Sequence, residues 1–334
     1  MNITDTELEM AVSDALFRIK RDYKKTNGNI YLSFSGGKDS TALAWLIMLS
    51  ELDTKIPFVF ANTGIELEAT LKFVKEFPYD NIHIVKPRKP FGVVLKEYGK
   101  PALSKLKSKG LSVYQRHLDE PLKSASARQM ITGDREKNGV KVSGRNSYKI
   151  ANKHMHFVHP DTEFKVANMC CQYMKKYPFQ DFEKENDMSG CFMGVRTAEG
   201  GTRSMMYTSC VMEKVKNGKT FITSMPIIDW SDEMVDKFLD YFKIPLSEAY
   251  TTYDLKRTGC CACPFSPNLE KELKVLHDYE PKKYKAVKHW LQDVYIYQDV
   301  KCEWDTEYME EYNRMKPIIE QRRKEMMEKY RNKE

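Results

Sequence analysis

Short apolar segments alternate with helical segments in the first quarter of the chain. Residues 30–34 form an apolar, β-prone run, and residues 41–49 follow it with helical character. Two further apolar runs, at 56–61 and 82–85, lie on either side of a helical stretch at 65–77. Strands that alternate with helices form crossover units with parallel strands. The pattern therefore predicts an α/β fold, a doubly wound and mostly parallel sheet with helices on both faces.

The remaining segments predict how the chain is organised around this sheet. Strand signals return at 192–228 and precede a helix at 230–242, which Ser231 caps. Residues 87–165 differ, because they combine weak periodicity with scattered Gly and Pro and many Lys and Arg. We expect an N-terminal helix within 1–27, an α/β domain at 28–266 with a basic insertion at about 87–165, and a helical C-terminal region at 267–334.

The composition argues against a membrane protein and leaves the partner open. The 334 residues are 41% hydrophobic, enough for a sizeable core, and contain no apolar run long enough to span a bilayer. The first residues are polar and acidic, unlike a secretory signal, so we expect a cytoplasmic protein. The net charge of +7 suits an anionic small substrate or a nucleic acid and does not select between them.

The turn after the first apolar run has the composition of a phosphate-binding loop. Gly36 and Gly37 allow a tight turn and close approach of the backbone to a ligand. The amides of the turn and of the following helix then point at an anion. The spacing differs from the Walker pattern. The residues expected to contact the ligand are Ser33, Ser35, Gly36, Gly37, Lys38, Asp39 and Ser40.

Four of the eight cysteines have a spacing typical of metal or redox chemistry. Cys170-Cys171 and Cys260-x-x-Cys263 provide four thiols, which zinc, thiol redox and iron–sulfur sites all use. The side chains of a vicinal pair diverge, so it chelates zinc poorly, and we favour a [4Fe–4S] cluster over zinc or unliganded thiols. Lys175, four residues after Cys171, is expected to offset negative charge there. We interpret three other cysteines as ordinary core or surface residues: Cys191, Cys210 and Cys302.

These motifs together resemble the phosphoadenosine phosphosulfate (PAPS) reductase family, which includes APS reductases and the ATPases of DNA phosphorothioation. Residues 35–40 resemble its PP-loop, Ser-Gly-Gly-x-Asp-Ser. The resemblance continues in order to residue 266. Its other matching segments are 62–70 after the second strand, 170–178 around the paired cysteines, 194–203 in the arginine loop, 226–231 and 257–265.

The resemblance implies an adenine nucleotide alpha hydrolase-like fold and a set of site residues. ATP or another adenine nucleotide, with Mg²⁺, would be held by the PP-loop and by Asn62, Thr63 and Gly64. The cluster ligands would be Cys170, Cys171, Cys260 and Cys263. The implied catalytic residues are Lys38, Asp39, Lys175, Arg196 and Arg203.

One departure separates this chain from the sulfonucleotide reductases of the family. Their catalytic cysteine lies in a C-terminal Glu-Cys-Gly-Leu/Ile-His motif, whereas Cys302 stands in Lys-Cys-Glu-Trp. We therefore expect an enzyme that adenylates an acceptor, releases pyrophosphate and supports sulfur transfer. A reductase with a substitute thiol and an inactive nucleotide-binding module are the alternatives. A sulfur donor or reductant protein would be a partner, and a homodimer is left open.

Two weaker patterns fall in the insertion. Its basic residues suggest a nucleic-acid or nucleotide acceptor, with a solvated basic surface as the alternative. Residues 153–159 contain three histidines, which we interpret as surface residues of an ordinary strand, with a metal site as the alternative. The residues expected to contact the nucleic acid are Lys105, Lys107, Lys109, Arg116 and Arg128.

Overall fold

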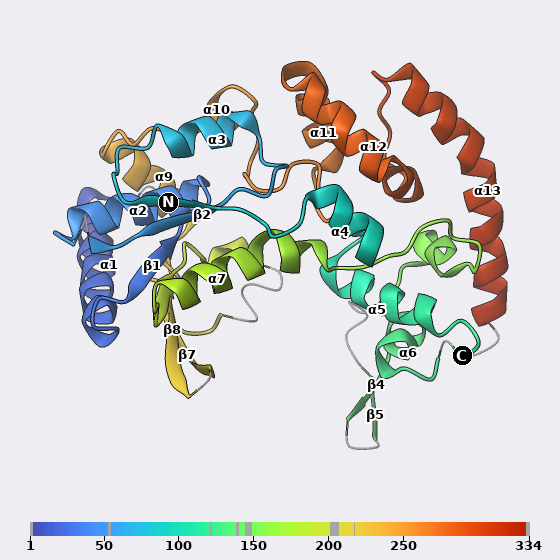
Figure 1. Cartoon of the computed structure of the whole chain (residues 1–334), viewed down its shortest axis with the longest axis horizontal. Helices are drawn as coiled ribbons and strands as arrows, with labels where there is room; N and C mark the ends of the chain where they lie inside the picture. Colours follow the sequence, from blue (N-terminus) through green and yellow to red (C-terminus); the bar gives the residue numbers. More distant parts are fainter. Residues whose placement is uncertain are drawn as a thin grey trace. The chain divides into compact units, whose positions relative to one another are not determined.

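The computed structural model describes residues 3–52, 55–120, 122–137, 140–143, 149–200, 207–216 and 218–331. It divides into two compact units (Figure 1). The first unit consists of Met1–Arg88 and Lys175–Cys260, and the second of Lys89–Met174 and Cys261–Glu334. Each unit thus combines two stretches that are distant in sequence. In the described ranges, every helix is too short or too polar to cross a membrane.

The first unit is built on a six-stranded sheet of order β3-β2-β1-β6-β8-β7. Neighbouring strands are parallel except β7 and β8, which form an antiparallel hairpin. The expected mostly parallel α/β sheet is therefore confirmed. The strands are β1 (Ile30–Ser33), β2 (Phe58–Ala61), β3 (Ile82–Val85), β6 (Gly190–Phe192), β7 (Val211–Lys216) and β8 (Lys219–Ser224).

Helices cover both faces of this sheet (Figure 1). Successive strand residues point to opposite faces, and in β1 the side chain of Leu32 packs in a core formed with four helices. On the other face, Tyr31 packs against Phe182 of α7 (Tyr177–Glu185). Burial on both faces explains why the segments of β1 and β2 read as continuous apolar runs rather than alternating ones. The four helices are α1 (Asp5–Lys25), α2 (Lys38–Leu49), α3 (Glu68–Lys75) and α9 (Asp232–Tyr241).

The strand order places a topological switch point next to β1. The chain continues from β1 to β2 and β3 on one side, whereas β6 pairs with β1 on the other side. Ligands of open α/β sheets bind at the carboxyl ends of the strands at such a point. The loops after β1 and β6 carry residues 35–37 and Gly194–Arg196, and a Cβ at Gly194 would lie 2.8 Å from the Asp39 carbonyl oxygen.

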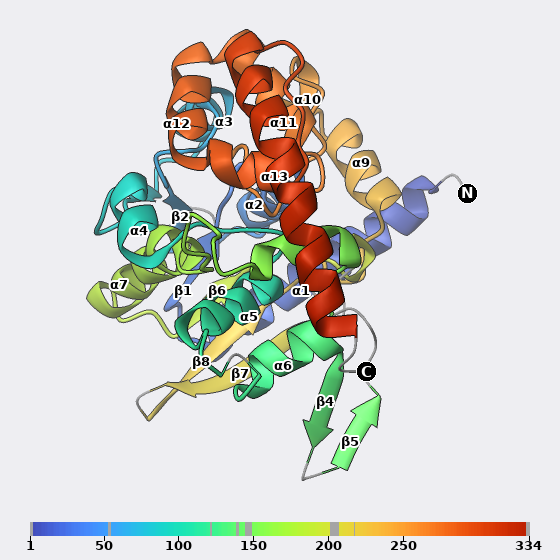
Figure 2. The same ribbon diagram turned by 90° about the vertical axis from the view of Figure 1, so that its right-hand side faces the viewer.

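The second unit is mainly helical (Figure 2). Helices α5 and α6 pack together, as do α11, α12 and α13. Its elements are α4 (Phe91–Tyr98), α5 (Lys105–Arg116), α6 (Ala125–Thr132), the hairpin β4 (Asp134–Lys137) and β5 (Val140–Ser143), η2 (Asn152–Val158), α11 (Leu269–Tyr279), α12 (Pro281–Tyr297) and α13 (Thr306–Arg331).

The first unit also contains η3 (Gln172–Lys176) in part, α3 (Glu68–Lys75), η4 (Thr197–Glu199) and α10 (Glu248–Thr251).

The prediction of a strand with surface histidines at 153–159 is wrong. Residues Asn152–Val158 form a 3₁₀ helix, and His156 is only 3% exposed. Four consecutive residues, 155–158, are buried, which an alternating strand at a surface cannot achieve. They pack against α13 and around the ring of Tyr297. Tertiary burial therefore decides the local conformation here.

Candidate functional site

The PP-loop is closed on itself by Ser40. The Ser35 amide donates a hydrogen bond to Ser40 Oγ (3.2 Å), and Ser40 Oγ donates to the Gly37 carbonyl (2.9 Å). Gly36 has a φ of +67°, and a Cβ there would lie 3.1 Å from a methyl group of Thr70 on α3. Glycine is required here because a side chain would be both strained and crowded. The result is a compact turn that ends at the N-terminus of α2.

Two partners of Lys38 come from distant segments. The Lys38 backbone N–H donates to the hydroxyl oxygen of Tyr250 (3.1 Å), and the Lys38 ammonium pairs with Asp236 (2.9 Å). The Lys38 amide lies at the N-terminus of α2, where the Tyr250 hydroxyl satisfies it. Neither partner was identified from the sequence, because each lies about two hundred residues away from Lys38.

Arg196 joins the loop after β6 to the PP-loop. Its side chain is 2% exposed, and its Nε and Nη2 atoms donate to Asp39 (3.0 Å) and Asp232 (2.6 Å). Burial raises the pKa of the Asp39 carboxyl, although Arg196 acts in the opposite direction. Burial acts to lower the pKa of Arg196, but its bonds with Asp232 and Asp39 raise it overall. Arg196 is therefore a fixed cation that orients Asp39. Arg203, the other predicted arginine, lies outside the described residues.

A second group of polar side chains follows β2. Thr63 Oγ1 donates to Glu66 Oε1 (3.0 Å), and the Lys175 ammonium lies 3.3 Å from the same oxygen. The Cys260 thiol donates to this carboxylate across 3.7 Å. Burial acts to lower the pKa of Lys175, but Cys260 and Glu66 together raise it well above its usual value. Sequence reasoning placed Glu66 in a motif without giving it a role, because the motif gave no sign of its partners.

The other predicted residues of this region have local roles or belong to the second unit. Asn62 Oδ1 accepts a hydrogen bond from the Gly64 amide (3.0 Å) and so shapes the turn after β2. Cys170, Cys171 and Cys263 belong to the second unit, whereas Cys260 ends the first. The eight cysteines, all within the described residues, form no disulfide bond. Within the described ranges, no group of three or more His, Cys, Asp or Glu side chains is arranged to hold a metal ion.

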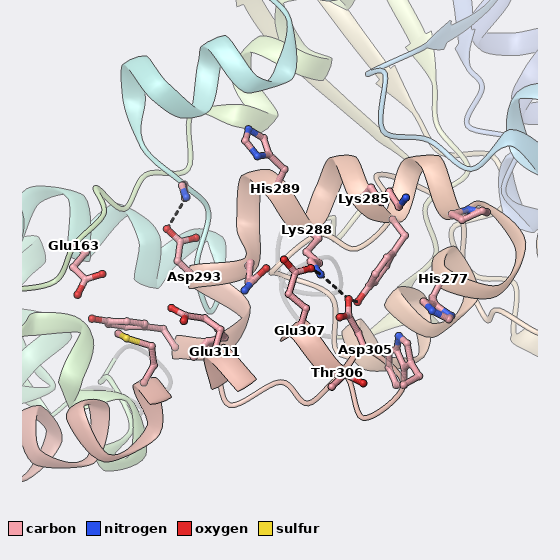
Figure 3. Close-up of a pocket in the computed structure, with 18 residues that line it drawn as sticks. Glu163, His277, Lys285, Lys288, His289, Asp293, Asp305, Thr306, Glu307 and Glu311 are labelled. Carbon is pink, nitrogen blue, oxygen red and sulfur yellow. Dashed lines mark hydrogen bonds and ion pairs between the residues drawn. The ribbon is translucent and has the colours of Figure 1, made fainter. Parts of the chain in front are cut away.

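The second unit contains a cavity of about 840 Å³ beside α12 and α13 (Figure 3). Charged groups in its wall pair with one another. Lys288 lies 2.9 Å from Asp305 and 2.7 Å from Glu307, and Lys100 lies 2.6 Å from Asp293. Residues predicted from the sequence to form the nucleotide and cysteine sites do not line this cavity. Its charges are largely satisfied by protein partners, so we assign it no function.

Comparison with known proteins identifies the family. A sequence model of the phosphoadenosine phosphosulfate reductase domain matches residues 29–141 and 136–266, well over half of the chain. The chain belongs to this family. The matched range includes the PP-loop, the Thr63–Glu66 group and the Gly194–Arg196 loop, which all belong to the first unit.

Individual relatives match less of the chain or match it more weakly. An uncharacterized protein of Methanocaldococcus jannaschii is 38% identical over 91 residues, which are 27% of this chain and 19% of that protein. The PAPS reductase of Candida auris, solved as a phosphate complex, is 13% identical, with a TM-score of 0.40 over 75% of this chain and 93% of that one. The FMN adenylyltransferase of Candida glabrata is 14% identical, with a TM-score of 0.43 over 78% of this chain and 65% of that one.

Proposed function

We propose that this protein binds ATP at the PP-loop and transfers its adenylyl group to an acceptor, with release of pyrophosphate. The observation that supports this most is the loop geometry at the switch point of the sheet. There, the closed turn at Gly36 and Gly37, the α2 N-terminus and the Lys38 ammonium come together beside the loop after β6. This combination suits a polyphosphate.

The chemistry requires positioning and charge stabilisation rather than covalent catalysis. An acceptor oxygen would attack the α-phosphorus, and the bond from this phosphorus to the bridging oxygen of the β-phosphate would break. Pyrophosphate would leave with that electron pair. The loop amides and Lys38 would hold the negative charge that develops on the phosphates. Contacts to the nucleotide would be completed by Ser33, Ser35, Ser40, Asn62, Thr63 and Gly64.

We assign different roles to the two arginines and to Asp39. Arg196 is engaged by two carboxylates, so its proposed role is to hold Asp39 in place across the two loops. Mg²⁺ would bind mainly to phosphate oxygens, with Asp39 as the protein carboxylate, since magnesium sites commonly use one or two carboxylates together with substrate phosphates. Arg203 is proposed to supply positive charge to the leaving pyrophosphate.

We also propose that Cys170, Cys171, Cys260 and Cys263 hold a [4Fe–4S] cluster. The donor set suits such a cluster, because none of the four thiols is used in a disulfide bond and Cys260 lies beside the ammonium of Lys175, which can balance a negative cluster. When bound, the cluster would supply an iron–sulfur centre for the handling of sulfur or electrons. In the following step, a sulfur nucleophile would attack the acceptor atom that carries the adenylated oxygen. The bond from this atom to the oxygen would break, and AMP would leave with the oxygen and the electron pair.

One observation disfavours the alternative of a sulfonucleotide reductase that uses Cys302. This side chain is 0% exposed, and burial raises the pKa of its thiol to about 12. A nucleophilic cysteine needs a thiolate and access to its substrate. Cys302 has neither, so we interpret it as a core residue.

A matched pair of variants tests the nucleotide site. Lys38→Ala removes the ammonium proposed to bind phosphate, whereas Asp236→Ala removes only its protein partner. We expect Lys38→Ala to weaken binding of ATP·Mg²⁺ about tenfold or more, because a charge-assisted bond is lost. Asp236→Ala is expected to bind ATP at least as tightly as the wild type. Isothermal titration calorimetry provides the measurement.

The reaction itself is tested with ATP labelled at the α-phosphate. Incubation with Mg²⁺ and candidate acceptors should give labelled AMP or an adenylated acceptor, together with pyrophosphate. Formation of ADP and inorganic phosphate would contradict adenylyl transfer. Equal loss of ATP affinity in both variants would show that the ion pair matters for the fold rather than for phosphate binding.

A further inference from the structure

Three hydroxyl groups converge on one side of Gly37 in the PP-loop. A Cβ built on this glycine would lie 3.0 Å from Thr258 Oγ1, 3.2 Å from Ser35 Oγ and 3.4 Å from the Tyr250 hydroxyl oxygen. The φ angle of Gly37 is −83°, which any residue adopts. Glycine at this position is therefore explained by space rather than by backbone conformation. A side chain here would occupy the place where the hydroxyls meet.

Tyr250 reaches the PP-loop from an anchored helical turn, α10. This helix begins after Ser247, whose hydroxyl accepts a hydrogen bond from the Ala249 amide (3.2 Å), and both of these residues are buried. α10 packs against α3 (Figure 1), and the Lys72 ammonium of α3 lies 3.0 Å from the Glu248 carboxylate. The fold therefore holds the backbone that carries the Tyr250 ring in place beside the loop.

The Tyr250 hydroxyl oxygen is used as a hydrogen-bond acceptor. The Lys38 amide donates to it across 3.1 Å. Burial raises the pKa of Tyr250, whereas hydrogen bonding by this amide and by Thr258 acts to lower it, as donors to a phenolic oxygen do. A hydroxyl group has two lone pairs and one proton. Because donors are directed at the oxygen, the phenolic proton is left for another acceptor, either directly or through the neighbouring Thr258 hydroxyl.

The position at the start of α2 makes an anion the suitable acceptor. The N-terminus of a helix carries partial positive charge on its amides. When a hydroxyl oxygen accepts from such an amide, the two hydrogen bonds polarise one another, and the hydroxyl proton becomes a better donor. The carboxylate of the same loop, Asp39, is engaged by Arg196. A phosphate oxygen of a bound nucleotide would complete the arrangement.

We propose that Tyr250 binds the pyrophosphate part of the nucleotide and that Thr258 positions the Tyr250 hydroxyl. This inference rests on the proposed ATP site and adds two residues to it. The O–H group of Tyr250 donates to an oxygen of the β- or γ-phosphate, and the Lys38 ammonium pairs with the same phosphates. Thr258 lies two residues before Cys260, so the phosphate site and the proposed cluster ligand share one short segment of chain.

Removal of a single oxygen atom tests the contact. Tyr250→Phe keeps the ring and its packing but loses the hydroxyl. ATP·Mg²⁺ and pyrophosphate·Mg²⁺ should bind to this variant about tenfold more weakly than to the wild type, because a hydrogen bond to a charged group is lost. AMP lacks the β- and γ-phosphates, so its Kd should be unchanged. Isothermal titration calorimetry on the full chain measures all three ligands.

Two further sets of variants provide the controls. Tyr241→Phe removes the same atom from a tyrosine of α9 that is 52% exposed, and it should bind all three ligands as the wild type does. Thr258→Val removes the positioning hydroxyl at nearly constant volume and should weaken ATP·Mg²⁺ binding about threefold. Thr258→Ser keeps a hydroxyl and should restore most of the affinity. Circular dichroism checks that each variant is folded.

The possible results separate this inference from the proposed function. Weaker binding of ATP and pyrophosphate to Tyr250→Phe, with AMP unchanged, supports the contact. Tighter ATP binding would show that the hydroxyl competes with phosphate for the Lys38 amide, and equal weakening for all three ligands would show a structural role. Either result, or an unchanged Kd, overturns the inference, while loss of ATP affinity in Lys38→Ala still supports the ATP site. A wild type that binds neither ATP nor pyrophosphate overturns both proposals.

Discussion

At the scale of single residues, Glu66 connects the predicted nucleotide and cysteine chemistry in the first unit. It is 2% exposed, and a buried carboxylate must be paired with a cation or with several donors. Lys175, Thr63 and Cys260 all approach it. Loss of Lys175 would leave a buried charge without its cation. A Lys175 variant therefore reports on stability first and on chemistry second.

Cysteine variants test the proposed cluster more directly. Replacement by Ser of any one of Cys170, Cys171, Cys260 or Cys263 should abolish the broad visible absorbance of a [4Fe–4S] cluster and reduce the bound iron, because each thiolate is a ligand. The measurement is iron and sulfide content and absorbance after anaerobic purification.

Cys191→Ala and Cys302→Ala are the controls, since both residues are buried and have no proposed ligand role. Both variants should keep the cluster. A colourless wild-type protein with stoichiometric zinc would refute the assignment, and so would equal iron loss in all six variants.

Sequence reasoning at this scale reached residues whose role depends on near neighbours. The PP-loop turn was predictable because glycine, hydroxyl and helix start lie within a few positions, from Gly36 to Ser40. Tyr250, Asp232 and Asp236 were not predictable. They meet Lys38 and Arg196 only after the chain has folded. The sequence does not distinguish an Asp that pairs with such a partner from one that faces solvent.

At the scale of elements, periodicity predicted the sheet well and failed at η2. The buried strands β1 and β2 have a distinctive apolar run. The edge strand β3 (Ile82–Val85), whose residues are half-buried or exposed, also begins and ends where it was predicted. The histidine segment was misread because its partners, Tyr297 and α13, lie far away in sequence. Such packing can enforce a 3₁₀ helix on residues whose alternation resembles a strand.

The buried histidines of η2 should make stability depend on pH. The pKa values of His154 and His156 are lowered from 6.5 to about 4 in the folded protein. Between these values, the unfolded chain binds more protons than the folded one, so acid favours unfolding. The stabilisation that comes from keeping these two histidines neutral is complete above about pH 6.5. It decreases as the pH falls towards 4, by up to roughly 3 kcal/mol for each histidine.

Thermal unfolding at several pH values, followed by circular dichroism, measures this effect. His154→Gln keeps a polar side chain but cannot titrate, so its Tm should fall less steeply than that of the wild type between pH 6.5 and 4. Parallel curves for the two proteins would show that the pKa of His154 is the same in the folded and the unfolded state.

At the scale of the whole molecule, each unit is formed by two separated stretches of chain. The basic insertion and the C-terminal helices were predicted as separate regions, and the structure groups residues 89–174 with 261–334. No local sequence pattern predicts this grouping, because it arises from contacts between distant segments, such as those of η2 with α13. The net charge of +7 therefore says little until the basic residues are placed on elements.

The basic residues of α5 and α6 are arranged in a way that helix stability does not explain. Lys105 and Lys107 lie in the first turn of α5, which contains no acidic residue. Cations at a helix N-terminus oppose the helix dipole, at a cost of about 0.3–1 kcal/mol each. Lys105, Lys109 and Arg116 are exposed, and Lys107 and Arg128 are half-buried. A polyanionic partner would offset this cost, so we retain nucleic-acid binding as a prediction.

Salt dependence distinguishes this prediction from a merely solvated surface. Affinity for labelled single- and double-stranded DNA and RNA should fall steeply with salt, since each neutralised phosphate releases counterions. A triple alanine variant at Lys105, Lys107 and Lys109 should make the slope of log K against log salt shallower by up to about 0.7–0.9 for each lost contact. A triple alanine variant at Lys301, Lys324 and Lys329, which are exposed outside α5 and α6, changes the net charge equally. Its slope should match the wild type, because release depends on local contacts. Equal slopes in the two variants would show that the salt dependence reflects net charge rather than contacts of α5. Absence of binding at the lowest salt would exclude a nucleic-acid acceptor at this surface.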